Sequence, residues 1–183
     1  MLLASSEAGA DGEDEVEARV DALIGLAADA LGLGRFAASA TLLDRADATL
    51  SGAADRPSRL AIRVQWVGAE LAMATGDGAT ALRHAERSVE LAAVAEGSIR
   101  HRVKSNVVLA AALCCASRLE EARTVADSAL AATGQCGLVP LRWALASLLN
   151  GIGSETYSGP EVLEIRDEAA RVVVERGGRW CDS

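Results

Sequence analysis

The sequence predicts an all-α protein, an α-solenoid of about four helix-turn-helix repeats. Alanine, the best helix former, accounts for 38 of the 183 residues. Apolar residues recur at intervals of three or four between short turns, which is the spacing of one helix face. The turns themselves recur every 41–42 residues. Because the sequence has one phenylalanine and few alternating β-branched residues, it does not predict a β-sandwich or a barrel.

We expect four helices in the first half of the chain, each with one apolar stripe. Their approximate ranges are 14–31, 36–50, 58–75 and 79–96. Gly32 and Gly34 end the first helix, because glycine accepts the left-handed conformation at a helix C-terminus. Residues 51–57 form a loop, and Gly97 ends the fourth helix. The stripes that define these helices include Val20, Leu23, Ala27, Phe36, Leu43, Leu50, Leu60, Val64, Leu71, Leu82 and Val89.

Four further helices are expected in the second half. Their approximate ranges are 98–116, 117–133, 139–150 and 158–176. Ser117 and Glu120 have the spacing of a capping box, in which each side chain satisfies a backbone donor at the helix start. Ser158 and Glu161 have the same spacing, and Pro160 lies in the first turn, where its missing N–H costs little.

The net charge of −8 is concentrated near the N-terminus. Residues 1–55 hold 11 acidic and 3 basic residues, whereas residues 56–183 hold 15 of each. We therefore expect a flexible acidic tail over 1–13, a repeat domain over 14–176 and a short C-terminal tail over 177–183. An acidic chain is a poor match for a nucleic-acid backbone, so nucleic acid is not an expected partner.

The N-terminal residues lack the basic and apolar regions of a secretory signal, and no apolar run is long enough to span a bilayer. These features predict a soluble, cytoplasmic protein without a membrane partner. The four cysteines follow no disulfide or zinc spacing and are interpreted as small buried residues.

The predicted repeat rests on the turns at Gly34, Gly76 and Ser117, which are 42 and 41 residues apart. A small residue follows each turn at the fifth or sixth place, namely Ala40, Ala81 and Ala122. A fourth, looser unit is predicted because Trp66 precedes Gly76, and Trp143 precedes Gly153, by the same ten residues. A helix pair repeated at this period indicates an α-solenoid, in which stacked pairs bury a continuous core.

Two segments resemble the second half of the tetratricopeptide repeat: Gly76-Asp77 followed by Ala81, and 119–122 followed by Ala126 and Ala129. The period exceeds the usual one of that repeat and is similar to the longer repeats in the helical arms of MalT-like bacterial transcription regulators. The resemblance covers about residues 14–176. It implies binding of peptides, partner proteins or small effectors on a concave face, and the regulators' ATPase and DNA-binding domains have no counterpart in this chain.

The residues that carry catalysis are sparse. His84 and His101 are the only histidines, and neither stands in a metal-binding or triad pattern. Lys104-Ser105 lacks the preceding glycine of a phosphate-binding loop, and no Gly-x-Ser-x-Gly motif occurs. The sequence therefore predicts no enzyme activity, no metal and no cofactor.

The strongest candidate site is a concave groove along the first helix of each pair. Projection of the repeat places three cations and two indoles there, which suits an acidic peptide or a C-terminal carboxylate. The predicted groove consists of Arg63, Trp66, Glu70, Met73, Lys104, Asn106, Arg142, Trp143 and Ser147.

Several alternatives stay open at this stage. Trp66 and Trp143 either line the groove or fill gaps in the core between alanines. The first functional hypothesis is a protein–protein interaction scaffold, and the second is a regulatory arm that senses a small molecule and acts on a transcription or signalling partner. The apolar run 172–174 on the last helix is covered either by Trp180 and the tail or by a second copy of the chain.

Overall fold

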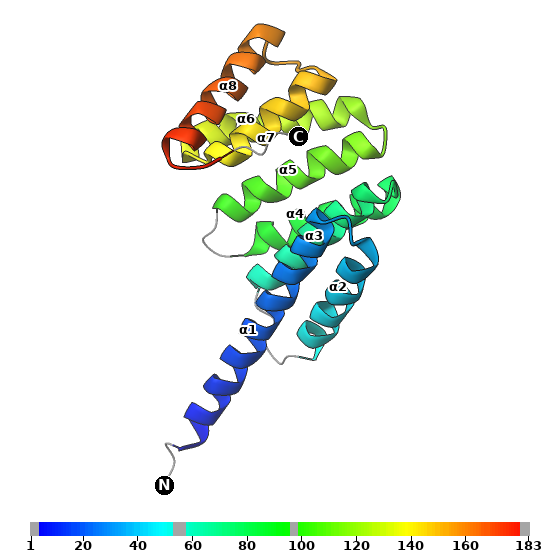
Figure 1. Ribbon diagram of the computed structural model, residues 1–183, viewed down its shortest axis with the longest axis vertical. Coiled ribbons are helices and arrows are strands. Elements are labelled where there is room, and N and C mark those ends of the chain that lie inside the picture. The colour runs from blue at the N-terminus through cyan, green and yellow to red at the C-terminus, as the bar shows by residue number, and fades with distance from the viewer. Residues whose placement is uncertain (1–3, 53–57, 96–98, 180–183) are drawn as a thin grey trace. The chain divides into compact units, whose positions relative to one another are not determined.

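The computed structural model describes residues 4–52, 58–95 and 99–179, and every regular element in these ranges is a helix (Figure 1). This confirms the predicted all-α class. The eight helices of the described residues are α1 (Ala4–Gly32), α2 (Phe36–Ser51), α3 (Ser58–Ala74), α4 (Gly78–Val94), α5 (Ile99–Cys115), α6 (Leu119–Cys136), α7 (Val139–Ile152) and α8 (Gly159–Glu175).

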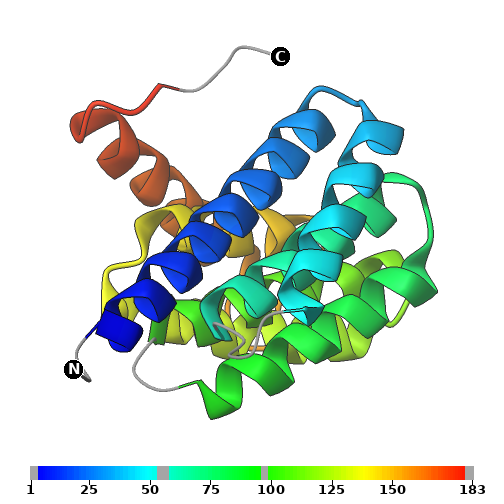
Figure 2. The same ribbon diagram turned by 90° about the horizontal axis from the view of Figure 1, so that it is seen from below.

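The chain divides into two compact units, residues 1–95 (unit 1) and 96–183 (unit 2). In unit 1, α1 packs against α2 and α3, α2 packs against α3, and α3 packs against α4 (Figures 1 and 2). In unit 2, α5, α6, α7 and α8 make the same set of contacts in the same order. Each unit thus contains two consecutive helix pairs. A repeat domain over 14–176 would comprise both units and stays a prediction.

Most helix boundaries fall within a few residues of their predicted positions, but the N-terminal one does not. α1 begins at Ala4, so the predicted boundary at residue 14 lies inside this helix, and the segment assigned to a tail is largely helical. At the other end, α8 stops at Glu175 before Gly177. The predicted stop at Gly97 and the cover from Trp180 fall on residues outside the described ranges.

The two predicted capping boxes have different outcomes. Ser158 N–H donates to Glu161 Oε2 (2.7 Å) at the start of α8, as predicted. The box at Ser117 and Glu120 is wrong, because α6 begins one residue later and Arg118 is its N-cap. Ser117 instead has a positive φ of 62° and closes the preceding turn, and Arg118 pairs with Glu121.

The three predicted turns share one backbone conformation. Gly34, Gly76 and Ser117 all have positive φ (69°, 77° and 62°). The N–H of each donates to the carbonyl three residues earlier, and the following N–H donates to the carbonyl five residues before it. The same closure therefore recurs at intervals of 42 and 41 residues, which gives the sequence period a structural basis.

Counted from these turn residues, the second helix of each pair buries the same positions. The small residue five places after the turn is fully buried in all three pairs, as Ser39, Ala81 and Ala122. Ser39 therefore occupies the position that the sequence analysis gave to Ala40, and its hydroxyl donates to the Ala27 carbonyl on α1 (2.9 Å). The equivalent buried positions are Ser39, Leu43, Ala46 and Leu50 on α2, Ala81, Ala85, Ser88 and Ala92 on α4, and Ala122, Ala126, Ala129 and Thr133 on α6.

The first helices show a matching pattern. The residue seven places before the turn is an alanine with no exposed surface in all three pairs, as Ala27, Ala69 and Ala110. A side chain of one methyl group lets two helices approach closely, whereas a larger one would hold them apart. These three alanines thus mark sites where the two helices of a pair pack closely.

Candidate binding site

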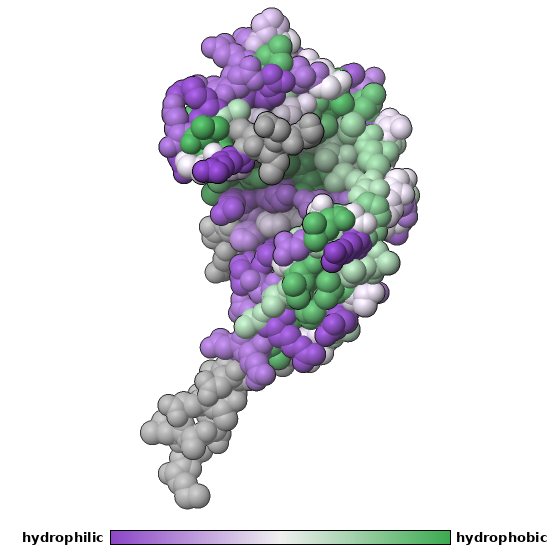
Figure 3. All heavy atoms as spheres, in the orientation of Figure 1, coloured by the Kyte–Doolittle hydropathy of each residue, from purple (hydrophilic) through white to green (hydrophobic). Residues whose placement is uncertain are grey.

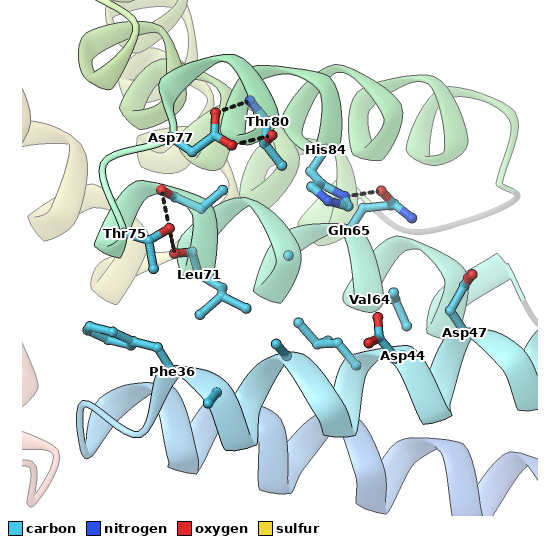
Figure 4. A pocket seen from close by; sticks show the side chains of 15 residues that line it. Phe36, Asp44, Asp47, Val64, Gln65, Leu71, Thr75, Asp77, Thr80 and His84 are labelled. Carbon is cyan, nitrogen blue, oxygen red and sulfur yellow. Dashed lines mark hydrogen bonds between the residues drawn. The ribbon is translucent and has the colours of Figure 1, made fainter.

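A cavity of about 540 Å³ lies between α2, α3 and α4 in unit 1 (Figure 4). One wall is the α2 segment 36–47, and the opposite wall is the α3 segment 64–75. The start of α4 closes the third side with Asp77, Thr80 and His84. The volume falls within the ordinary range of pockets that bind ligands.

One end of the cavity is apolar. Phe36 opens α2 and remains 38% exposed, and in Figure 4 its ring lies at the same end of the cavity as Leu71 of α3. Ala37 and Ala40 continue this wall along α2. The surface view shows hydrophobic residues gathered over α1 and α2 on the near face of unit 1 (Figure 3). An exposed aromatic ring beside a hollow of this size offers a contact for an apolar group.

The other end is polar and acidic. Asp44 and Asp47 rise from α2, and Gln65 and His84 face them from α3 and α4 (Figure 4). His84 Nδ1 donates to Gln65 Oε1 (2.7 Å). Neither Asp44 nor Asp47 is hydrogen-bonded or ion-paired to a residue within the described ranges. Their carboxylates are therefore available to a ligand.

The third acidic residue, Asp77, has a structural role. It is the N-cap of α4: its carboxylate accepts hydrogen bonds from Thr80 N–H (2.9 Å) and from the Thr80 hydroxyl (2.6 Å). These bonds from Thr80 lower the pKa of Asp77, and the charge of Arg83 adds to the effect. Asp77 is thus held in its ionised form by its own helix terminus.

His84 is held against the backbone of α3. Its half-buried imidazole lies so close to Gly68 that a Cβ at that position would come within 3.0–3.2 Å of three ring atoms. Burial lowers the pKa of His84, the positive charge of Arg83 lowers it further, and the carboxylate of Asp47 partly opposes both. The imidazole is therefore neutral at pH 7, and it adds no positive charge to the cavity.

The charge of the lining is one-sided. It contains three aspartates, whereas none of its described residues is a lysine or an arginine. Chemically, the cavity can hold a group that is apolar at one end and cationic at the other.

The predicted groove residues fall in both units. In unit 1, Arg63 is ion-paired with Asp21 of α1, so its charge is compensated inside the fold. Trp66, Glu70 and Met73 share the same helix and are partly buried.

In unit 2, Lys104 and Asn106 lie on α5, and Arg142, Trp143 and Ser147 lie on α7, all of them partly buried. The Arg142 guanidinium reaches the Leu130 carbonyl (3.5 Å). The Ser147 hydroxyl is buried and has no hydrogen-bond partner among the described residues, which indicates a packed position. A groove that includes residues of both units, and the choice between groove and core for the two tryptophans, stay predictions.

A second hollow, of about 610 Å³, lies in unit 2 beside α8. Its lining is mostly charged and already paired, since Arg171 bonds to Glu168 and Glu175. Val172 and Val173 on the same helix are partly buried, and Val174 is 53% exposed. A homodimer through this helix stays a prediction.

The α2–α3–α4 cavity was not predicted, because projection of the repeat considers only the first helix of each pair. Two signals pointed to it: Phe36 follows a turn directly, on the second helix, and Gly68 interrupts an otherwise apolar first helix. A glycine inside a helix costs stability and indicates a close approach, here by His84.

Comparison with known proteins adds no assignment: neither a protein-family model, nor a curated protein, nor a solved structure matches the chain. Among the described helices, none is long and apolar enough to cross a membrane. The described residues also contain no group of three histidine, cysteine or acidic side chains arranged to hold a metal ion.

Proposed function

We propose that this protein is a non-enzymatic helical-repeat module that binds a peptide or a segment of a partner protein. The observation that carries the proposal is the α2–α3–α4 cavity, a hollow of about 540 Å³ with an exposed aromatic ring. It also has two carboxylates, Asp44 and Asp47, without a hydrogen-bond or ion-pair partner among the described residues. The recurrence of one turn conformation at Gly34, Gly76 and Ser117 supports the repeat architecture. The resemblance of the sequence to tetratricopeptide-like helical arms supports the proposal that the module binds a peptide or partner protein.

The elongated shape of the site favours a polypeptide over a compact small molecule. Both long walls cover about eleven residue steps, 36–47 on α2, and 64–75 along α3 and the residue that follows it. At a rise of 1.5 Å per residue, these walls are about 17 Å long. A groove of this length between two helices matches the way in which amphipathic helices are bound by other proteins.

A second candidate function is the sensing of a small effector in a cytoplasmic regulatory protein. The volume of the cavity lies within the range of small-molecule sites, and this observation favours the binding of a small effector as the second candidate. A bound effector would stabilise unit 1 by mass action. A thermal-shift screen against small amphiphilic cations would therefore reveal it as a rise in melting temperature.

Site-specific photocrosslinking tests the proposed function. A benzophenone amino acid replaces Phe36, and a matched protein carries it at Leu26, which is 55% exposed on α1 and does not line the cavity. We expect a crosslinked partner from position 36 that position 26 does not give. Ala40→Leu, which narrows the cavity between its walls, should suppress this product. Equal crosslinking from both positions would contradict the proposal.

A further inference from the structure

We propose that the ligand of the α2–α3–α4 cavity is a basic amphipathic helix of a partner protein. Its apolar side chains contact Phe36 and Leu71, and a lysine or arginine two to three turns further along pairs with Asp44 and Asp47. This inference rests on the proposed function, because it specifies the chemistry of the segment that the cavity binds.

The first step of the argument is the distribution of charge. The lining residues include three aspartates, and none of the described ones is a lysine or an arginine. Asp77 is already engaged by Thr80 and lies near Arg83, so its charge is partly satisfied. Asp44 and Asp47 have no such partner among the described residues.

The second step is the spacing of these two carboxylates. Residues three apart on a helix lie on the same face, so Asp44 and Asp47 stand next to each other and repel. The surrounding groups do not relieve this repulsion: Gln65 is neutral, and burial keeps His84 neutral at pH 7. A cation that entered from a partner would be attracted by both carboxylates at once.

The third step is the separation of the apolar and acidic ends. Phe36 precedes Asp44 by eight residues and Asp47 by eleven on the same helix, which corresponds to about 12–17 Å. On a ligand helix, this distance separates side chains by about two to three turns. The site thus selects the composition of the ligand helix and the order of its side chains, with apolar groups at one end and a basic group at the other.

The test uses three fluorescein-labelled peptides of fourteen residues with blocked ends. The first carries leucines on one face of its first two turns and lysines on the same face of its last turn, with alanine and glutamine elsewhere. The second has glutamate in place of each lysine, and the third has serine in place of each leucine. Fluorescence anisotropy with the full chain at low salt gives the dissociation constants.

We expect the leucine–lysine peptide to bind more tightly than either control peptide. Asp44→Asn together with Asp47→Asn should weaken it about threefold to tenfold, the range of two exposed ion pairs, and added salt should reduce the difference. The control Asp29→Asn with Glu86→Gln removes the same charge from exposed positions that do not line the cavity, and it should leave binding unchanged. Circular dichroism verifies that each variant is folded.

Three results overturn the inference in distinguishable ways. If the lysine and glutamate peptides bind equally and Ala40→Leu blocks both, the cavity binds polypeptides without preference for basic ones, and the proposed function stands alone. If the lysine peptide binds but both charge-neutralised double variants weaken it equally, its binding is adsorption to an acidic protein. Absence of peptide binding, together with the absence of crosslinking from position 36, removes the proposed function as well.

Discussion

Asp21 of α1 and Arg63 of α3 form an ion pair between residues that are 42 positions apart in the chain. Glu17 and Arg59 form a second pair with the same separation, at 2.9 Å. The separation of 42 residues is the same as the interval between the turns at Gly34 and Gly76. Residues at equivalent positions of α1 and α3 therefore carry opposite charges and form ion pairs.

Because Arg63 pairs with Asp21, a substitution of Arg63 would affect the stability of unit 1 as well as any binding to the predicted groove. Arg63→Glu places a glutamate opposite Asp21, so we expect it to destabilise unit 1. A loss of partner binding by this variant alone would therefore not identify Arg63 as a binding residue. Asp21→Arg in the same chain restores opposite charges at this pair, but it also places a positive charge beside Arg59, whose Nη1 lies 3.5 Å from Asp21 Oδ1. We therefore expect it to recover only part of the stability.

A double-mutant cycle measures this coupling. We expect an interaction free energy of about 0.5–1 kcal/mol from the single and double neutral variants Asp21→Asn and Arg63→Gln, because both side chains are partly exposed. Hydrogen exchange of the α1 and α3 amides is the readout, and the amides of unit 2 serve as the internal control. An interaction energy of zero would show that the pair adds nothing to the register.

Ser117 allows a stabilising substitution. It has the positive φ that glycine provides at the equivalent positions 34 and 76, and a side chain is strained in this conformation. We expect Ser117→Gly to increase the free energy of unfolding by about 1 kcal/mol, measured by urea titration.

Gly76→Ala is the reciprocal control. A Cβ at Gly76 would meet no atom within 4 Å, so only the backbone conformation opposes the change. We expect this variant to lose about 1 kcal/mol. If Ser117→Gly gave no gain while Gly76→Ala caused a loss, the third turn would not be equivalent to the second.

Most of the helix boundaries could be predicted from the sequence because they depend on local signals. Gly34 and Gly76 end helices by their own conformational freedom, and Ser158 with Glu161 starts one through contacts three residues apart. Ser117 has two predicted roles, in a turn and as a helix cap, because serine suits both. Its positive φ confirms the turn, and Arg118 takes the place of the cap.

The candidate site was not predictable in the same way. Phe36, Gln65 and His84 come from three helices, and the hollow between them depends on how far α2 stands from α4. Periodicity identifies which face of a helix is apolar, but it does not give the distance between two helices. The prediction of Arg63 as a groove cation has a similar cause. Periodicity does not show that Arg63 pairs with Asp21, which lies 42 positions away in the chain.

Asp127 anchors the loop between α7 and α8 to α6. Its buried carboxylate accepts hydrogen bonds from the Ser154 hydroxyl (2.6 Å) and from the N–H groups of Glu155 (2.9 Å) and Thr156 (3.2 Å). We expect Asp127→Ala to lower the free energy of unfolding by about 2 kcal/mol, since it leaves these donors without their acceptor.

Asp127→Asn should cost less than the alanine variant, because its amide oxygen can still accept from the loop backbone. Ser128→Ala changes an exposed neighbour on the same helix and should have little effect. Urea titrations of the three variants give the comparison. Equal stability of the alanine variant and the wild type would show that the loop does not depend on this anchor.

His84 gives the stability of unit 1 a dependence on pH with a defined sign. Burial and Arg83 lower its pKa in the folded state below the ordinary value of 6.5, so the unfolded chain binds the proton more readily. The contribution of the neutral imidazole is fully present above pH 6.5 and is lost as the pH falls through that value toward the folded-state pKa. We expect His84→Gln to remove this dependence. Urea titrations of the variant and the wild type from pH 7.5 to pH 5 give the free energies of unfolding. The difference between them isolates the contribution of His84, because both proteins share the carboxylates and His101. A parallel decline of the two proteins over this range would show that the folded and unfolded states bind the His84 proton equally, and that Asp47 offsets the effects of burial and Arg83.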